Sequence, residues 1–89
     1  MHLVAVTLLC PAPARPPLTA GAVTDLMWVH SRGEDRVEHL RARVDRNRCH
    51  IAAAIIADTP DAAAANLRRV CERALRHVPA LHGWRLVLG

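Results

Sequence analysis

The chain has 89 residues, which is enough for one domain, residues 1–89, and too few for a large core. Its apolar fraction of 52% overstates the core, because much of it is alanine and there is no Phe or Tyr. The net charge is +4 and every basic residue is Arg. These Arg residues are scattered and lack an aromatic platform, so the composition does not favour nucleic-acid binding.

Three widely spaced cysteines, Cys10, Cys49 and Cys71, form no CxxC pattern. Such an arrangement is typical of reduced thiols, and it predicts a cytoplasmic protein. The apolar run before Cys10 has no basic residue ahead of it and is too short to span a bilayer, and Leu9 is too large for a lipoprotein cleavage site. We therefore expect a buried strand there rather than a signal.

The first half of the chain predicts a strand, a loop and a helix. Residues 2–10 are continuously apolar and rich in β-branched residues, and the prolines of residues 11–17 then predict a stiff, extended loop. Thr19 is the expected cap of a helix that runs to about Ser31, with Gly33 as a left-handed stop. The expected apolar stripe of this helix is Ala22, Val23, Leu26, Met27 and His30.

Residues 36–57 predict two strands that fold back on each other at Arg46-Asn47. The first, about 36–45, alternates charged and apolar side chains, whereas the second, 48–57, is almost wholly apolar. Asn tolerates a positive φ, which suits a tight hairpin. The expected pairs are Val44–Cys49, Ala42–Ile51 and Leu40–Ala53 on one face, and Arg43–His50, Arg41–Ala52 and His39–Ala54 on the other.

The sequence from Asp58 to Asp61 predicts a helix start. Thr59 is the expected cap, Pro60 suits the first helical position, and Asp61 favours the positive end of the helix. This helix is expected to end at about His77, and a last strand is expected over residues 84–88. Its predicted apolar stripe is Ala63, Leu67, Val70, Cys71, Ala74 and Val78.

The resulting order, β-α-β-β-α-β, resembles the ferredoxin-like plait. The resemblance implies an α+β fold with a four-stranded antiparallel sheet and two helices on one face. It also implies a sheet order of 4-1-3-2, with strands one and three in the centre. The sequence agrees with this order, because the two wholly apolar runs are strands one and three and the charges lie on strands two and four.

The sheet face away from the helices is the expected contact surface. Its centre is expected to carry Val, Ile and Ala side chains, which are too apolar to be simply solvated. We therefore expect two copies to pack sheet on sheet, or a partner to dock there. The alternative is a monomer, in which small alanines make this face only mildly apolar. The candidate ligand or interface residues on this face are His39, Arg41, Arg43, His50, Ala52, Ala54 and Ile56.

No metal, cofactor or catalytic group is expected. His39 and His50 share a face, but the expected register separates them by roughly 13 Å along the ladder, too far for one zinc ion. No Ser/His/Asp or Cys/His arrangement has a useful spacing. Cys10 is a possible nucleophile at a strand end, although a buried structural thiol is the preferred interpretation.

Two families with this element order suggest functions. The stretch VTLLCPAPARPPLTAGAV, a strand, a proline loop and a helix, resembles the regulatory ACT-type amino-acid-binding modules, and that resemblance implies a ligand at a subunit interface near Arg15 to Thr19. The family's Asp-Arg-Pro-Gly loop is Arg-Pro-Pro-Leu here.

The chain also resembles small dimeric plait proteins of the antibiotic-biosynthesis monooxygenase or cyclase type. That resemblance implies an organic substrate enclosed between the sheet and the helices. The candidate residues on that reading are His39, Arg41, His50 and Trp84.

The preferred hypothesis is a homodimeric, non-enzymatic binding or regulatory module that recognises a small molecule or a protein. The alternative is a dimeric monooxygenase- or cyclase-like enzyme that acts on a hydrophobic metabolite. A third option is nucleic-acid binding through Arg residues of the second strand and second helix. No membrane partner is expected.

Overall fold

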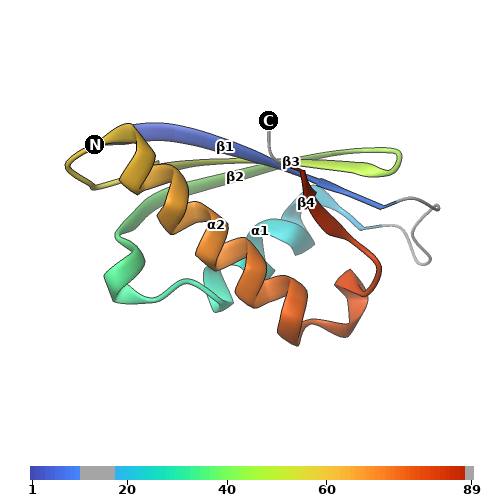
Figure 1. The fold of residues 1–89 in the computed structure, drawn as a ribbon. Coiled ribbons are helices and arrows are strands. Elements are labelled where there is room, and N and C mark those ends of the chain that lie inside the picture. The colour runs from blue at the N-terminus through green and yellow to red at the C-terminus, as the bar shows by residue number, and fades with distance from the viewer. Residues whose placement is uncertain (11–17, 88–89) are drawn as a thin grey trace.

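The structure is a computed structural model that describes residues 1–10 and 18–87. It is a small α+β fold with a four-stranded antiparallel sheet and two helices (Figure 1). The predicted proline loop and the candidate Arg15 lie outside the described residues. The elements are β1 (His2–Leu9), α1 (Ala20–Val29), the 3-10 turn η1 (Gly33–Asp35), β2 (Val37–Asp45), β3 (Arg48–Ile55), α2 (Pro60–His77), the 3-10 turn η2 (Pro79–Leu81) and β4 (Arg85–Val87).

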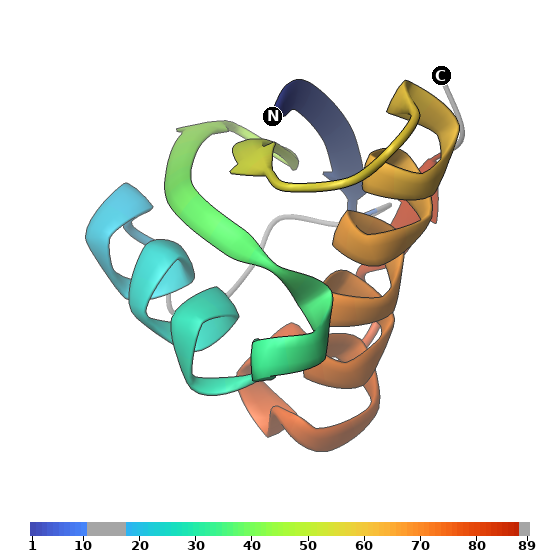
Figure 2. The same ribbon diagram turned by 90° about the vertical axis from the view of Figure 1, so that its left-hand side faces the viewer.

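The strands are ordered β2-β3-β1-β4, which is the expected order seen from the other edge. All neighbouring strands are antiparallel, and the order fits a ferredoxin-like plait. Both helices cover the same face of the sheet, α2 against β1 and α1 against β2 (Figure 1). In the view of Figure 2, η1 lies between the two helices. The opposite face of the sheet has no helix over it, and we call it the open face.

The β2–β3 hairpin has the predicted register. All six expected pairs are present, from Val44–Cys49 beside the turn to His39–Ala54 at the far end. The left-handed turn residue is Arg46, with φ of 53°, and not Asn47. β3 ends at Ile55, two residues earlier than expected. Because a shift of one residue would move every side chain to the other face, the register fixes the composition of the open face.

Helix α1 begins where predicted and ends two residues early. The Thr19 hydroxyl accepts a hydrogen bond from the Ala22 N–H at 3.1 Å. Val23 and Met27 are buried, but Ala22 is exposed, so its placement on the apolar stripe was wrong. Val29 is the last helical residue. The helix turns its Val23 and Met27 toward the core.

The predicted stop at Gly33 was wrong as well. Gly33 opens the turn η1, and the left-handed residue that follows is Arg36, with φ of 58°. Gly33 does not have a positive φ, so the turn does not depend on glycine there. The turn is stabilised instead by the Asp35 carboxylate, which accepts a hydrogen bond from the Arg32 N–H at 2.8 Å.

Helix α2 has the predicted bounds. The Thr59 hydroxyl accepts a hydrogen bond from the Ala62 N–H at 3.0 Å, and Pro60 occupies the first turn. Every residue of the predicted apolar stripe is buried: Ala63, Leu67, Val70, Cys71, Ala74 and Val78. Together with Leu8, Ile51 and Ile55 of the sheet they form one core.

Strand β4 begins one residue later than expected. It comprises Arg85–Val87, and the predicted end at Leu88 lies outside the described residues. Trp84 precedes the strand and is only 6% exposed, because its ring belongs to the core. Among the described residues, no helix combines the length and the apolar character that are needed to cross a membrane.

Candidate contact surface on the open sheet face

The open face is built as four rows of residues that run across the sheet. Residues opposite one another on paired strands point to the same side, so the ladder pairs define each row. The rows are His39–Ala54–Leu3, Arg41–Ala52–Ala5, Arg43–His50–Thr7–Val87 and Asp45–Arg48–Leu9–Arg85.

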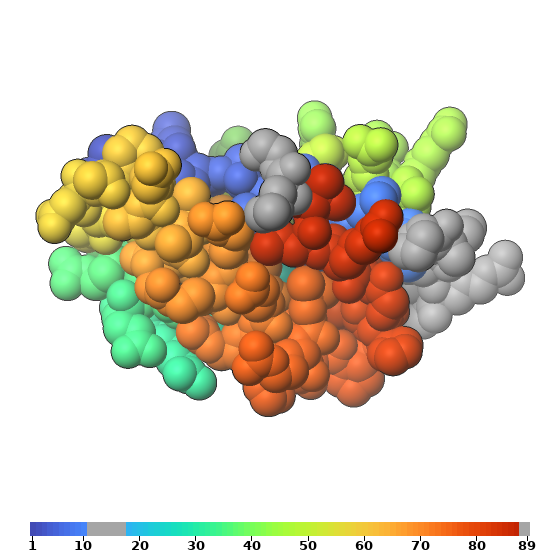
Figure 3. Space-filling view, viewed as in Figure 1, coloured from blue at the N-terminus to red at the C-terminus, as the bar shows by residue number. Residues whose placement is uncertain are grey.

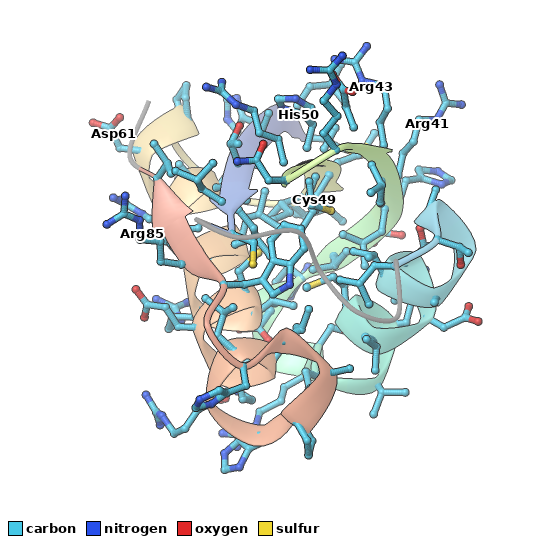
Figure 4. The ribbon with its side chains drawn as sticks, turned by 90° about the vertical axis from the view of Figure 1, so that its right-hand side faces the viewer. Arg41, Arg43, Cys49, His50, Asp61 and Arg85 are labelled. Carbon is cyan, nitrogen blue, oxygen red and sulfur yellow. The ribbon has the colours of Figure 1, made fainter. Side chains whose placement is uncertain are left out.

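Side chains of the first three rows project away from the helices. Figure 4 shows Arg41, Arg43 and His50 on the outer side of the sheet, whereas Cys49, the neighbour of His50, points into the core. In Figure 3 side chains of the β2–β3 hairpin (yellow-green) stand out from the side of the molecule opposite α2 (orange). This arrangement follows the period-two alternation of a strand.

The apolar part of the open face is centred on Leu3, whose exposed fraction is 86%. Val87 of the third row is 37% exposed. Ala52 is exposed, but Ala54 is only 5% exposed, although it lies on this face. Its ladder partners His39 and Leu3 lie on either side and cover it. Ala54 therefore lies at the bottom of a depression and offers little surface to a partner.

The small alanines leave a hollow between larger side chains. Its volume is about 380 Å³, and it lies over the first two rows. The residues that line it are Leu3, His39, Leu40, Arg41, Ala52, Ala53 and Ala54. It therefore has an apolar floor and a polar rim supplied by β2.

A second, smaller hollow of about 210 Å³ lies over the third row. It is lined by Ala5, Val6, Thr7, His50 and Val87. The Thr7 hydroxyl and Nδ1 of His50 share a hydrogen bond of 3.1 Å across the β1–β3 ladder. This bond fixes the orientation of the imidazole and leaves Nε2 as the ring nitrogen available to a ligand.

The open face is positively charged. Arg41, Arg43, Arg48 and Arg85 are exposed in the rows, and Asp45 is the single carboxylate among them. The last row places Asp45 opposite Arg48 at the end of the hairpin, which leaves the charges of Arg41 and Arg43 uncompensated by a row neighbour. Such a face attracts anionic groups.

The remaining predicted site residues are less central. Ile56 follows the end of β3, is 38% exposed, and is in none of the rows; its N–H donates to the Arg36 carbonyl at 3.0 Å. His39 and His50 lie in different rows, as expected. No group of three or more His, Cys, Asp or Glu residues within the described ranges could hold a metal ion.

A buried acidic site was missed by the sequence reasoning. Asp35 is fully buried, and its carboxylate accepts hydrogen bonds from Nη1 of Arg73 at 3.0 Å and from the Arg32 N–H at 2.8 Å. Burial raises the pKa of Asp35, but these hydrogen bonds and the charges of Arg73 and Arg69 outweigh it, so the pKa lies below 3.8. The only local signal was an acid three residues after Arg32, which supplies one half of a capping box. The other half is absent, because Arg32 has no side-chain acceptor.

This site uses much of the positive charge of α2. Arg69 lies 3.8 Å from the second Asp35 oxygen, and Arg73 also donates to the carbonyl of His30. A hollow of about 320 Å³ beside them is lined by Arg32, Arg69, Glu72, Arg73, Arg76 and His77. Two guanidiniums of this cluster, those of Arg69 and Arg73, are therefore paired with the buried Asp35 carboxylate.

Comparison with known proteins adds no family. No protein-family model matches the chain, and neither a curated protein nor a solved structure is detectably similar to it.

Proposed function

We propose that the chain is a ferredoxin-like plait that acts as a non-enzymatic binding module and self-associates through its open face. The element order, the strand order and the position of both helices on one face support the fold. The open face supports the binding role, because it carries two hollows whose linings include Arg41, His39 and His50.

The main support for self-association is the exposed side chain of Leu3. This side chain stands in a central strand, 86% exposed, on a sheet face that no helix covers. Burying one Leu side chain completely contributes about 1.5–3 kcal/mol per copy. A standard interface buries roughly 800 Å² on each partner. The whole molecule extends 38 by 23 by 19 Å, so such an interface would occupy most of one of its sides.

The positive charges limit how two copies can meet. Like charges placed directly opposite each other would weaken the dimer. A two-fold axis near Leu3 and Ala5 would join the apolar ends of the two faces and leave the rows of Arg43 and Arg48 at the rim, where water and salt screen them. Arg41 shares the row of Ala5 but lies two strands away, on the edge strand β2. The proposed dimer therefore tightens as the salt concentration rises.

Light scattering on a sizing column tests the dimer. At tens of micromolar we expect twice the chain mass, and Leu3→Arg should give a monomer because it adds a like charge to each apolar centre. Val29→Arg is the matched control, since Val29 is 74% exposed on α1, away from the open face. A monomeric wild-type protein, or equal effects of the two substitutions, would refute the proposal.

A further inference from the structure

We propose that the hollow over Ala52 and Ala54 binds a small organic acid, a carboxylate on an apolar body. The inference rests on the binding role proposed for the open face but not on the dimer, because every lining residue comes from one copy. Leu3 lies both in this hollow and at the proposed dimer axis, so the acid and a second copy compete for the same surface. It goes further in naming the site and the chemical class of the ligand.

The floor of the hollow suits an apolar group. The side chains of Ala52 and Ala54 form it, and Leu3 forms one wall. Ala53 lies between them in β3, but its methyl group belongs to the core on the other side of the sheet. The volume of about 380 Å³ accommodates on the order of ten non-hydrogen atoms, taking about 30 Å³ for each as for liquid water. A ring or a short alkyl chain laid on this floor would remove the exposed surface of Leu3 from water.

The rim of the hollow suits a carboxylate. Arg41 and His39 line it from β2, and Arg43 is two residues further along the same strand. No Asp or Glu is among the lining residues, and no ion-pair partner of Arg41 is found in the described part of the chain. A guanidinium can donate two parallel hydrogen bonds to one carboxylate, which fixes the ligand's orientation.

Other ligands fit this hollow less well. Single-stranded nucleic acid depends on aromatic side chains that stack on bases, and the lining contains no Phe, Tyr or Trp. A neutral apolar molecule of the same shape would cover the floor but would leave Arg41 without an anionic partner. The hollow is open to solvent, so we expect binding in the range of tens of micromolar to millimolar.

Calorimetric titration with two matched probes tests the site. The probes are 3-phenylpropanoate and its uncharged amide, which have the same shape, and inorganic phosphate serves as an anion without an apolar body. We expect saturable binding of the acid, with the amide and phosphate at least ten times weaker. Shifts of backbone amide signals should concentrate on Leu3, Arg41 and residues 52–54.

Two substitutions locate the site. Arg41→Gln should weaken binding of the acid about 10- to 100-fold, as expected for a lost hydrogen bond to a charged group. Ala52→Leu should abolish binding by filling the hollow, and its amide spectrum shows whether the variant is folded. Arg85→Gln is the control, because it removes the same charge from the same face outside the hollow, and it should leave the affinity unchanged.

Several results would overturn the inference. They are equal binding of the acid and the amide, equal losses in Arg41→Gln and Arg85→Gln, no saturation at 10 mM acid, or tighter binding of an oligothymidylate than of the acid. Light scattering before the acid is added separates the two proposals. A protein that is already monomeric and binds the acid supports this site and refutes the dimer. A protein that is dimeric and binds none of the probes at 10 mM supports the dimer and refutes this site.

Discussion

The buried carboxylate of Asp35 and the guanidinium of Arg73 are 3.0 Å apart, although 38 residues separate them in the sequence. Arg73 also donates to the carbonyl of His30, just after the end of α1. One side chain of α2 therefore holds both η1 and the end of α1. Asn66, two turns further toward the start of α2, adds a hydrogen bond of 3.2 Å to the Asp35 carbonyl.

Removal of Arg73 should destabilise the fold strongly. Arg73→Gln leaves Asp35 fully buried without its main cation, and breaking a buried pair in this way costs about 3–5 kcal/mol. Guanidinium denaturation followed by circular dichroism measures the loss. The double variant with Asp35→Asn should recover part of it, because the buried charge is then gone as well.

An exposed pair supplies the control for this measurement. Arg32 and Glu34 are 3.7 Å apart and their side chains are 63% and 70% exposed. Solvent screens such a pair, so Glu34→Gln should change the free energy of unfolding by less than about 1 kcal/mol. Equal effects of Arg73→Gln and Glu34→Gln would show that the buried pair does not stabilise the fold.

The Asp35 site also predicts how stability depends on pH. The pKa of Asp35 lies below its ordinary value of 3.8, so the unfolded chain binds a proton at a higher pH than the folded chain does. The stability that Asp35 contributes is therefore fully present above about pH 5, begins to fall near pH 4, and is lost as the pH drops through the folded pKa.

Unfolding free energies measured between pH 6 and pH 2 test this dependence. The difference between the wild-type protein and Asp35→Asn isolates the contribution of Asp35 from those of the other carboxylates. That difference should shrink as the pH falls below about 4. A difference that stays constant, or grows toward low pH, would contradict the depressed pKa.

The sequence predicted the elements whose evidence is local, and missed what depends on distant contacts. The hairpin register was predicted correctly because the alternation of β2 and the two-residue turn leave few other pairings. The α2 stripe was correct because caps and periodicity agree. Asp35 was missed because a charged residue in a polar turn is usually exposed, and its partner Arg73 is on another element.

The candidate site was predictable only in outline. Alternation placed His39, Arg41 and His50 on the open face, but nothing in the sequence showed that Ala54 would be covered by its ladder neighbours. The hollow arises from the contrast between small and large side chains on adjacent strands, and the pair Thr7–His50 requires the β1–β3 register. The hollow and the Thr7–His50 hydrogen bond both depend on the pairing of β1 with β3. Local sequence patterns do not predict that pairing.

The thiols of Cys49 and Cys71 should be unreactive in the folded protein. Burial raises the pKa of Cys49 to about 11 and that of Cys71 to about 12, from 9.0. For Cys49 this lowers the thiolate fraction about 100-fold at pH 8, and the thiolate is the form that reacts. Iodoacetamide labelling followed by peptide mass spectrometry should modify both residues only when guanidinium unfolds the chain. Rapid labelling of either residue in buffer alone would contradict their burial.

Arg46 limits the stability of the hairpin that carries the open face. Its φ of 53° is in the left-handed region, which costs a residue with a Cβ about 1–2 kcal/mol. Arg46→Gly removes that strain but makes the unfolded chain more flexible, so the net stabilisation should be roughly 0.5–1 kcal/mol. Guanidinium denaturation at constant pH measures the change in the unfolding free energy.

Asn47→Gly is the matched control, because Asn47 lies in the same turn without a positive φ. That substitution relieves no strain in the folded state and only makes the unfolded chain more flexible. It should therefore lower the free energy of unfolding by up to about 1 kcal/mol. The Asn47 carbonyl accepts a hydrogen bond from the Cys10 N–H at 2.8 Å, and both variants retain that backbone bond. If Arg46→Gly proves less stable than Asn47→Gly, the turn does not carry its strain at Arg46.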